Sequence, residues 1–192
     1  MNFYILVILS YLLGSIPFGY LIPKFKNVDI RRVGSKGTGA TNVSRALGLK
    51  YAVLVGVLDI LKASLPVFLA FKYLNNEVLI GIVMFVAVLG HIFPVWLKFK
   101  GGKGIATFVP SMVVILGVVP ALVLFLIWVA LLKITRTMSL NNLVLLWLLP
   151  FAFWYFSHSG VYFILGVSFY LITLWAHREN VYRLYNKKEL KL

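Results

Sequence analysis

The chain of 192 residues contains no cysteine, so disulfide bonds, thiol nucleophiles and thiolate metal sites are excluded. Acidic and imidazole side chains are scarce, with five Asp and Glu residues and three His residues. This leaves little material for a multi-ligand metal centre or a paired-carboxylate hydrolase. Charged residues amount to only 12% of the chain, against roughly 25% in a soluble domain, which argues against a water-soluble protein.

Apolar and basic residues are abundant instead. Hydrophobic residues make up 61% of the chain, and 19 Lys and Arg residues give it a formal net charge of +14. A bilayer core of ~30 Å is crossed by about 20 apolar residues, and several runs approach or exceed that length. These runs are Asn2 to Ile22, Tyr51 to Phe71, Val78 to Leu97, Ile105 to Leu132, Leu140 to Phe156 and Val161 to Ala176. The first lacks a basic start and a small-residue cleavage site, so we expect a retained span rather than a signal peptide.

The basic residues fall mainly in four clusters between these runs, at 24–50, 98–103, 133–136 and 178–191. Cytoplasmic loops concentrate Lys and Arg, so all four clusters are predicted on the cytoplasmic side. The nearly neutral connections at 73–77 and 157–160 are then predicted on the other side.

The run from Ile105 to Leu132 is expected to cross the membrane an even number of times, because the basic clusters before and after it are both predicted on the cytoplasmic side. We predict a hairpin of two short helices, each about 14 residues or ~21 Å long, that turns near Gly117 to Pro120. One long tilted helix is the alternative. The hairpin predicts an all-α polytopic membrane protein with seven transmembrane helices, an external N-terminus and a cytoplasmic C-terminus. Residues 1–192 are expected to form one integral membrane domain.

The segment from Gly34 to Arg45 is rich in glycine, hydroxyl and amide groups. Glycines at alternate positions allow backbone N–H groups to turn inward, and the Arg45 guanidinium matches phosphate oxygens. The pattern favours an anion-binding loop. A flexible connector or an electrostatic anchor to anionic lipid remains an alternative.

Two further polar motifs are predicted on the same membrane face. The segment 100–107 stands where a loop enters a helix, so free N–H groups, the helix dipole and Lys103 are expected to converge on an anion. It lacks the spacing of a Walker loop. The third motif begins at His177. If the last helix continues, His177 and Asn180 share one face, whereas Arg178 and Glu179 point elsewhere.

Other embedded polar residues have structural and functional interpretations. Asp59 and Lys62 are three apart within a span and can form an ion pair, for which the structural interpretation is slightly favoured. His91, followed by Pro94, is expected to cap or bend the third span. Three polar residues between the fifth and sixth spans can line a site or cap a helix; they are Ser139, Asn141 and Asn142.

In four segments the chain resembles the bacterial acyl-phosphate:glycerol-3-phosphate acyltransferases, the PlsY family. The segments are LLGSIPFGYLI, the GSKGTGATN loop that leads to Arg45, HIFPVWLKFKGGKGIAT and HRENVYRL. The resemblance implies transfer of a fatty acyl group from acyl-phosphate to sn-glycerol 3-phosphate, which yields lysophosphatidate and phosphate. It also implies a multi-pass enzyme of phospholipid biosynthesis in the cell inner membrane, whose active site faces the cytoplasm.

The resemblance also assigns site residues. It implies that Ser35, Arg45 and Lys103 hold or polarise the phosphates, and that His177 and Asn180 position glycerol 3-phosphate. The implied phosphate-binding residues are Gly39, Thr41, Asn42, Gly101, Gly102, Gly104 and Thr107. Because acyl-phosphate is a mixed anhydride with a good leaving group, no metal, cofactor or covalent acyl-enzyme is required. The expected partners are the two substrates and the lipid bilayer, and no nucleic acid partner is expected.

Two alternatives remain at this point. A nucleophilic Ser35 activated by His177, with Asp29 or Glu179 as the orienting acid, would give covalent catalysis. The preferred hypothesis is that the departing phosphate acts as the base.

A channel or transporter for phosphorylated metabolites explains the charge and the spans, but it does not explain why the polar clusters lie on one face.

Overall fold

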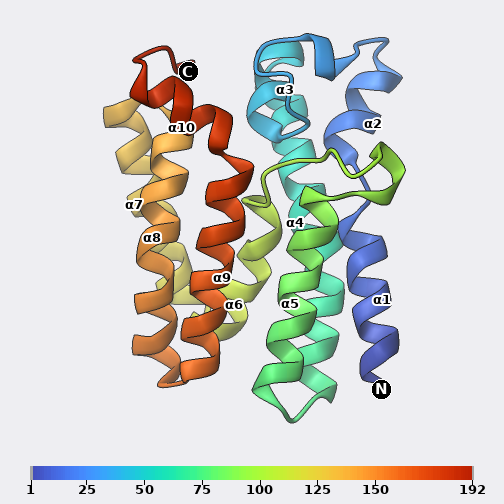
Figure 1. Ribbon diagram of the computed structural model, residues 1–192, viewed down its shortest axis with the longest axis vertical. Coiled ribbons are helices and arrows are strands. Elements are labelled where there is room, and N and C mark those ends of the chain that lie inside the picture. Colours follow the sequence, from blue (N-terminus) through green and yellow to red (C-terminus); the bar gives the residue numbers. More distant parts are fainter. Residues whose placement is uncertain (1, 192) are drawn as a thin grey trace. The chain divides into compact units, whose positions relative to one another are not determined.

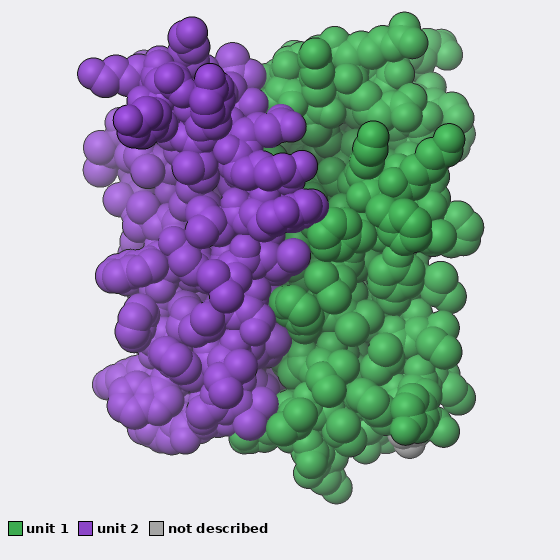
Figure 2. All heavy atoms as spheres, in the orientation of Figure 1, with its two compact units in different colours: residues 1–110 green, residues 111–192 purple. Residues whose placement is uncertain are grey.

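The computed structural model describes residues 2–191, and over that range the chain is helical, with ten α-helices and three short 3₁₀ helices (Figure 1). The chain divides into two compact units, residues 1–110 and 111–192 (Figure 2). The all-α prediction is confirmed. Whether residues 1–192 act as one domain stays a prediction.

The first unit is built around three long apolar segments. The elements are α1 (Phe3–Gly14), α2 (Phe18–Phe25), η1 (Ile30–Arg32), α3 (Ala40–Leu47), α4 (Leu49–Tyr73), α5 (Glu77–Ile92), η2 (Val95–Leu97) and η3 (Ala106–Phe108). Helices α1, α4 and α5 pack against one another. The first predicted span is broken into α1 and α2 at Ser15 to Pro17. Helix α5 ends at Ile92, two residues before Pro94, so the predicted interruption after His91 is confirmed.

Small residues allow the close helix packing of this unit. A Cβ atom at Gly14 would overlap the carbonyl oxygen of Ala87 on α5, and one at Gly90 would overlap the carbonyl oxygen of Tyr11 on α1.

The ion pair predicted from the spacing of Asp59 and Lys62 is confirmed, with Lys62 Nζ 2.8 Å from Asp59 Oδ1.

The long run from Ile105 to Leu132 is not one helix. After η3 it forms α6 (Val109–Leu116), breaks at Gly117, and continues as α7 (Val118–Thr135). Gly117 has a φ of 84°, a left-handed conformation that glycine adopts without a steric penalty. The predicted break is therefore present, but the arms are unequal: α7 has 18 residues and α6 has eight, rather than about 14 each. Pro120 falls in the first turn of α7, where a missing N–H costs no helical hydrogen bond.

The second unit contains most of α6, then α7, α8 (Met138–Ser157), α9 (Gly160–Ala176) and α10 (Arg178–Tyr185). Helices α8 and α9 pack closely, and a Cβ atom at Gly166 would lie 2.7 Å from Pro150 Cα. Helices α9 and α10 meet at an angle of 67°.

Much apolar surface is exposed on these helices. Only 6% of the α7 span is buried, and large side chains such as Val118 and Leu126 are 68% and 56% exposed. An apolar surface of this extent suits hydrocarbon rather than water. Within residues 2–191, five helical segments are long and apolar enough to cross a membrane, or six if α9 and α10 form one bent span.

Candidate active site

The first polar loop is organised by one buried amide. Asn42 lies in the first turn of α3 and is 2% exposed. Its Oδ1 accepts a hydrogen bond of 2.9 Å from the backbone N–H of Ser35. Its Nδ2 lies within hydrogen-bonding distance of three carbonyl oxygens, those of Ile30 at 3.2 Å, Val33 at 2.9 Å and Gly37 at 2.9 Å. The sequence predicted that Asn42 contacts phosphate, but the structure places its amide inside the loop, where it shapes the backbone.

The turn that precedes Ser35 lies beside the Arg45 side chain. Gly34 adopts a φ of 54°, and a Cβ atom there would overlap Asn42 Oδ1, so only glycine fits at the turn before Ser35. The same Cβ would lie 3.5 Å from Arg45 Cδ, which shows that the arginine side chain runs beside this turn. Ser35 and Arg45 are both half-buried. Arg45 and the turn before Ser35, both predicted to act on phosphate, are thus neighbours.

The acidic residue nearest this loop in sequence is already engaged. Asp29 accepts a hydrogen bond of 2.9 Å from Arg31 Nε, and it lies 3.5 Å from Arg32 Nε. The hydrogen bond from the Arg31 side chain holds the pKa of Asp29 below its ordinary value. The Arg31 guanidinium in turn lies 4.8 Å from the centre of the Tyr20 ring. The Asp29 carboxylate is therefore already paired with Arg31 and Arg32 of its own segment, which leaves it less able to serve as an orienting acid.

The second polar loop folds back on the end of α5. Lys98 and Phe99 have left-handed φ values of 53° and 61°, which reverse the chain. The N–H of Gly101 then donates to the Ile92 carbonyl oxygen, and the N–H of Gly102 donates to the His91 carbonyl oxygen, each at 3.1 Å. These two N–H groups are used within the protein, so the expectation that they converge on an anion is wrong.

Packing also explains three glycines of this loop. A Cβ atom at Gly101 would overlap the His91 carbonyl oxygen, and one at Gly102 would overlap the His91 ring at Nε2. Gly104 has a φ of 84°, and a Cβ atom there would lie 2.9 Å from Val88 Cγ1. The side chain of Thr107 is fully buried and donates to the Gly104 carbonyl oxygen at 2.9 Å.

The loop does not enter a regular helix as the sequence predicted. It continues into η3, which has three residues, before α6 begins at Val109. Such a short element supplies little of the dipole invoked for anion binding. Lys103, which lies between Gly102 and Gly104, is half-buried, whereas Lys98 and Lys100 of the same loop are exposed. Two further residues predicted to bind phosphate lie at the start of α3: Gly39 is its N-cap and Thr41 is in its first turn. Both are half-buried, and a Cβ atom at Gly39 would meet no atom within 4 Å.

In the second unit, His177 stands at the bend between α9 and α10. The helix does not continue straight through it, yet His177 and Asn180 are both buried, whereas Arg178 and Glu179 are exposed as predicted. His177 Nδ1 lies 2.9 Å from the carbonyl oxygen of Thr173. The Glu179 carboxylate is 73% exposed and lies 3.9 Å from Arg183 Nη1. The orienting-acid arrangement required by a serine–histidine nucleophile is therefore not formed by Glu179.

Sequence reasoning missed Glu189, which is the centre of the polar network in this unit. Its carboxylate accepts hydrogen bonds from Asn180 Nδ2 at 2.5 Å, Ser139 Oγ at 2.8 Å and Arg183 Nε at 2.7 Å. Burial of this side chain, which is 7% exposed, would raise the pKa of Glu189, but the three hydrogen bonds hold that pKa below its ordinary value. The available signal was an acid near the end of the basic cluster 178–191, where Glu179 is the other acid.

The two amides of α8 are turned toward α7. Asn142 Oδ1 accepts a hydrogen bond of 3.0 Å from Trp128 Nε1, and Asn141 Oδ1 accepts one of 2.7 Å from Thr135 Oγ1. Both amides are buried, so the structural interpretation of this pair is favoured. Across the described residues 2–191, no group of three or more His, Asp or Glu side chains is arranged to hold a metal ion.

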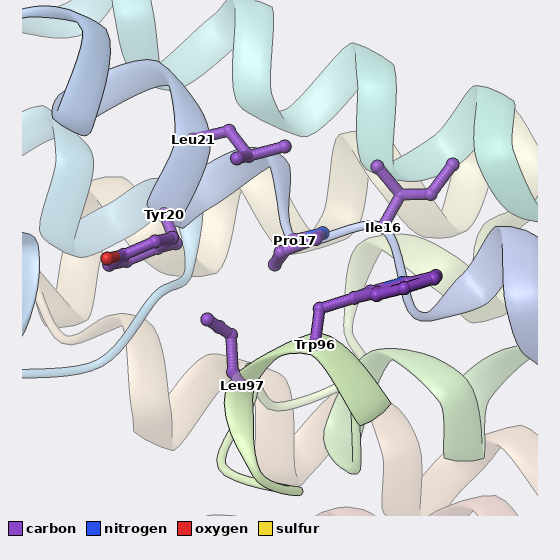
Figure 3. Close-up of a pocket in the computed structure, with 6 residues that line it drawn as sticks. All are labelled: Ile16, Pro17, Tyr20, Leu21, Trp96 and Leu97. Carbon is purple, nitrogen blue, oxygen red and sulfur yellow. The ribbon is translucent and has the colours of Figure 1, made fainter.

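An apolar groove lies in the first unit beside the basic loops, with a volume of about 330 Å³. Figure 3 shows the side chains that line it, with the Trp96 ring near Ile16 and Pro17, and Leu97 opposite Tyr20. The lining residues are Ile16, Pro17, Tyr20, Leu21, Trp96 and Leu97. Lys24 Nζ lies 5.6 Å from the centre of the Tyr20 ring, and the Arg31 guanidinium contacts the same ring. Two cationic side chains therefore lie beside a groove whose walls are apolar.

Comparison with known proteins decides the family. The profile described as glycerol-3-phosphate acyltransferase matches residues 4–187. The chain belongs to the glycerol-3-phosphate acyltransferase family. Proteins of that description from Bartonella quintana and Pelagibacter ubique are 42% and 41% identical to it, over 96% and 100% of this chain and 89% and 98% of theirs.

Solved structures agree with this membership. The chain is similar to crystal structures of PlsY (YgiH), described as an integral membrane glycerol 3-phosphate acyltransferase, in two forms. The glycerol 3-phosphate form is 38% identical with a TM-score of 0.88, and the lysophosphatidic acid form is 35% identical with a TM-score of 0.90. Each alignment covers 99% of this chain and 95% of the other. The chain is thus a multi-pass membrane acyltransferase of PlsY type, as the sequence resemblance indicated.

Proposed function

We propose that the enzyme transfers a fatty acyl group from acyl-phosphate to sn-glycerol 3-phosphate and releases lysophosphatidate and phosphate. The observation that carries the acceptor and the product is the close likeness to a PlsY structure in its lysophosphatidic acid form, together with one in its glycerol 3-phosphate form. The donor is inferred from the chemistry. A mixed anhydride is already activated, and this chain, which has no cysteine, supplies no thiol for an acyl-enzyme.

The proposed reaction is a direct transfer. A hydroxyl oxygen of glycerol 3-phosphate attacks the acyl carbonyl carbon, a new ester C–O bond forms, and the bond from that carbon to the phosphate oxygen breaks. The hydroxyl proton passes to the departing phosphate, which leaves as inorganic phosphate. No protein group needs to accept the proton, so the enzyme contributes orientation and charge stabilisation.

The proposed roles rest on the sequence resemblance together with the contacts of the two loops. The Arg45 side chain lies beside the turn that precedes Ser35, and both residues are assigned to a phosphate, while Lys103 is assigned to the phosphate of the donor. His177 and Asn180 are assigned to the acceptor. Asn42, Gly101, Gly102, Gly104 and Thr107 act by shaping the two loops, because their polar groups or the space around them are used within the protein.

The apolar groove of the first unit is assigned to the acyl chain. Its walls are apolar, and the cations beside Tyr20 would face the anionic end of an amphiphile. A chain in this groove would extend toward hydrocarbon while its phosphate stayed in water, which is the geometry required for a substrate that arrives from the bilayer.

The proposed topology has seven spans, an external N-terminus, a cytoplasmic C-terminus and a cytoplasmic active site in the cell inner membrane. The positive clusters support this orientation, and the break at Gly117 supports an even number of crossings between 105 and 132. With eight residues, or ~12 Å, α6 would cross only with thinning of the bilayer or with protein around it. A cysteine introduced at Val118 should then react with an impermeant reagent from outside the cell.

The decisive experiment is a donor assay. Purified protein is given glycerol 3-phosphate with either palmitoyl-phosphate or palmitoyl-CoA, and both phosphate and lysophosphatidate are measured. We expect turnover with the acyl-phosphate that survives EDTA. Strong activity with acyl-CoA and none with acyl-phosphate would refute the proposed donor, and activity lost with EDTA and restored by a divalent ion would refute the metal-free reaction.

Variants separate charge stabilisation from covalent catalysis. Lys103→Ala and Arg45→Ala should each lower the rate by about 10²–10³, the scale for loss of one preorganised electrostatic donor. The exposed Lys100→Ala is the matched control and should retain activity. When glycerol 3-phosphate is withheld, mass spectrometry should find no acyl group on Ser35. An acylated Ser35 at kinetically competent levels would establish a covalent mechanism instead.

A further inference from the structure

Three ionisable side chains meet inside the first unit, away from the polar loops in sequence. Asp59 and Lys62 lie on α4, His91 lies on α5, and they are 2%, 6% and 7% exposed. Lys62 Nζ lies 2.8 Å from Asp59 Oδ1 and 3.0 Å from His91 Nδ1, and His91 Nδ1 lies 3.6 Å from Asp59 Oδ1. Ionisable groups buried in membrane helices are costly and usually serve function, so this group calls for a role.

The three side chains contact two non-helical segments, the interruption between α1 and α2 and the loop that follows α5. Lys62 Nζ donates a hydrogen bond of 2.7 Å to the Ile16 carbonyl oxygen, at the interruption between α1 and α2. His91 presents Nδ1 to the ion pair, and the opposite edge of its ring fills the space beside Gly102. A Cβ atom at Gly102 would overlap Nε2 and would lie 2.8 Å from both Cδ2 and Cε1. The backbone also connects the two residues through the hydrogen bond from Gly102 to the His91 carbonyl oxygen.

We propose that Asp59, Lys62 and His91 are positioning residues, which act through the His91 ring to hold the segment from Gly101 to Gly104 in the shape that presents Lys103 to the acyl-phosphate. This inference rests on the proposed function for the identity of the substrate. The mechanical part, a buried ionic group that supports the loop, rests on the contacts alone.

The physical reason is the orientation of the ring. A histidine ring can turn about its side-chain torsions, and the contacts of Nδ1 with Lys62 and Asp59 select one orientation. The loop glycines have no side chains of their own to hold the loop against α5. The His91 ring, the Val88 and Ile92 side chains beside Gly104 and two backbone hydrogen bonds make that contact, and of these only the ring is fixed by the ion pair. Misplacement of a catalytic group by about 1 Å can cost 10²-fold in rate, so a small shift of the loop is enough to impair Lys103.

The first test compares His91→Ala and His91→Asn with Ser10→Ala. Ser10 is a buried residue that joins α1 to α5 by a hydrogen bond of 2.7 Å from its Oγ to the Val83 carbonyl oxygen, so it controls for loss of a buried polar contact. Amide hydrogen exchange is measured over residues 98–107. We expect faster amide exchange over these residues in both His91 variants. In Ser10→Ala, exchange over the same residues should equal that of the wild-type protein. Unchanged exchange in a folded His91 variant would overturn the proposal.

Steady-state kinetics then separates positioning from general destabilisation. In His91→Asn, which retains a polar group near the ion pair, the KM for acyl-phosphate should rise about tenfold or kcat should fall by a similar factor, while the KM for glycerol 3-phosphate stays within about twofold. Equal effects on both KM values would contradict a role confined to this loop.

The sharpest test is a double-mutant cycle. Gly102→Ala places a methyl group where the His91 ring lies, so it should strongly impair the enzyme. In a His91→Ala background all three of the nearest atoms are gone. The further loss caused by Gly102→Ala should then shrink by about tenfold or more, within the range found for contacting residues. Additive effects would overturn the proposal.

These readouts distinguish the two proposals. If wild-type protein fails to use acyl-phosphate, the proposed donor is wrong, and the exchange measurement still decides whether the His91 ring supports the loop. If wild-type protein uses acyl-phosphate and the loop of a folded His91 variant is unaltered, the positioning role alone is wrong. His91→Asn serves in both measurements if His91→Ala fails to fold.

Discussion

Replacement of Asn42 by Ala is predicted to disorganise the first polar loop while leaving the helices intact. The side chain accepts a hydrogen bond from the Ser35 N–H and contacts the carbonyl oxygens of Ile30, Val33 and Gly37. Alanine removes all of these contacts. Because Asn42 is buried, water does not reach every group left behind without opening the loop.

The magnitude follows from the number of contacts. A hydrogen bond contributes about 0.5–1.5 kcal/mol net, and one Nδ2 group shared among three carbonyl oxygens does not deliver three full bonds. We therefore expect a local loss of about 2–4 kcal/mol. At about 1.4 kcal/mol for each factor of ten, this corresponds to local opening that is roughly 30- to 1,000-fold more frequent. Because Ser35 is positioned by this network, we expect the rate of acyl transfer to fall by about 10²-fold.

Asn42→Asp is the more discriminating change. The Asp carboxylate can still accept from the Ser35 N–H. Its second oxygen, however, would face the three carbonyl oxygens to which Asn42 Nδ2 donates in the wild-type protein. Repulsion among these acceptors should make Asp at least as harmful as Ala. If the amide matters only as an acceptor for Ser35, Asp would instead be tolerated.

Amide hydrogen exchange over residues 30–45 is the assay, measured in detergent-purified protein together with turnover. Ser44→Ala, a half-buried residue on the same helix α3, is the matched control and should leave both readouts unchanged. Full activity and normal protection of the loop in Asn42→Asp would refute the reasoning that the donated hydrogen bonds shape this site.

Three further predictions use other parts of the chain. Gly39→Ala should change stability by no more than about 0.5 kcal/mol, since its Cβ meets no atom within 4 Å, but it should lower kcat/KM if phosphate approaches this backbone; unchanged kinetics would exclude that approach. Because the pKa of Glu189 is lowered in the folded protein, its ionised form stabilises the fold above the usual glutamate range, so the protection of α10 amides, relative to the free-peptide exchange rate at the same pH, should fall as pH drops below about 4, whereas Glu189→Gln should show reduced protection already at neutral pH. Cysteines at Asn75 and Gly160 should react with an impermeant reagent outside intact cells and one at Lys36 should not; labelling at Lys36 would reverse the orientation.

The spans and their interruptions were largely predictable because they depend on local composition. Apolar runs marked the long helices, and Gly117 marked the break between α6 and α7. The spacing of Asp59 and Lys62 predicted their ion pair because residues three apart share a helix face. The lengths of α6 and α7 were not predictable, since the preceding η3 takes the first residues of the run and Val118 starts the next helix directly after the glycine.

Contacts distant in sequence were not predictable. His91 joins Lys62 across 29 residues, and Ser139 joins Glu189 across 50, because helix packing brings them together. Sequence spacing carries no information on such pairs. It also does not reveal whether a backbone N–H in a glycine-rich loop faces a ligand or another part of the protein, which is why Gly101 and Gly102 were assigned to phosphate rather than to the end of α5.

The glycines of the two loops therefore fall into classes that look alike in sequence. At Gly101 and Gly102 a side chain would collide with α5 or with Pro94, so packing within the protein requires glycine. At Gly37 a Cβ would make only an ordinary contact with Ser35, and at Gly39 it would meet open space. Gly39 precedes α3 as its N-cap, where serine, aspartate or asparagine would serve the helix slightly better. Since the fold does not require glycine at these two positions, close approach of a substrate phosphate to the backbone at Gly39 stays a prediction, and the kinetics of Gly39→Ala test it.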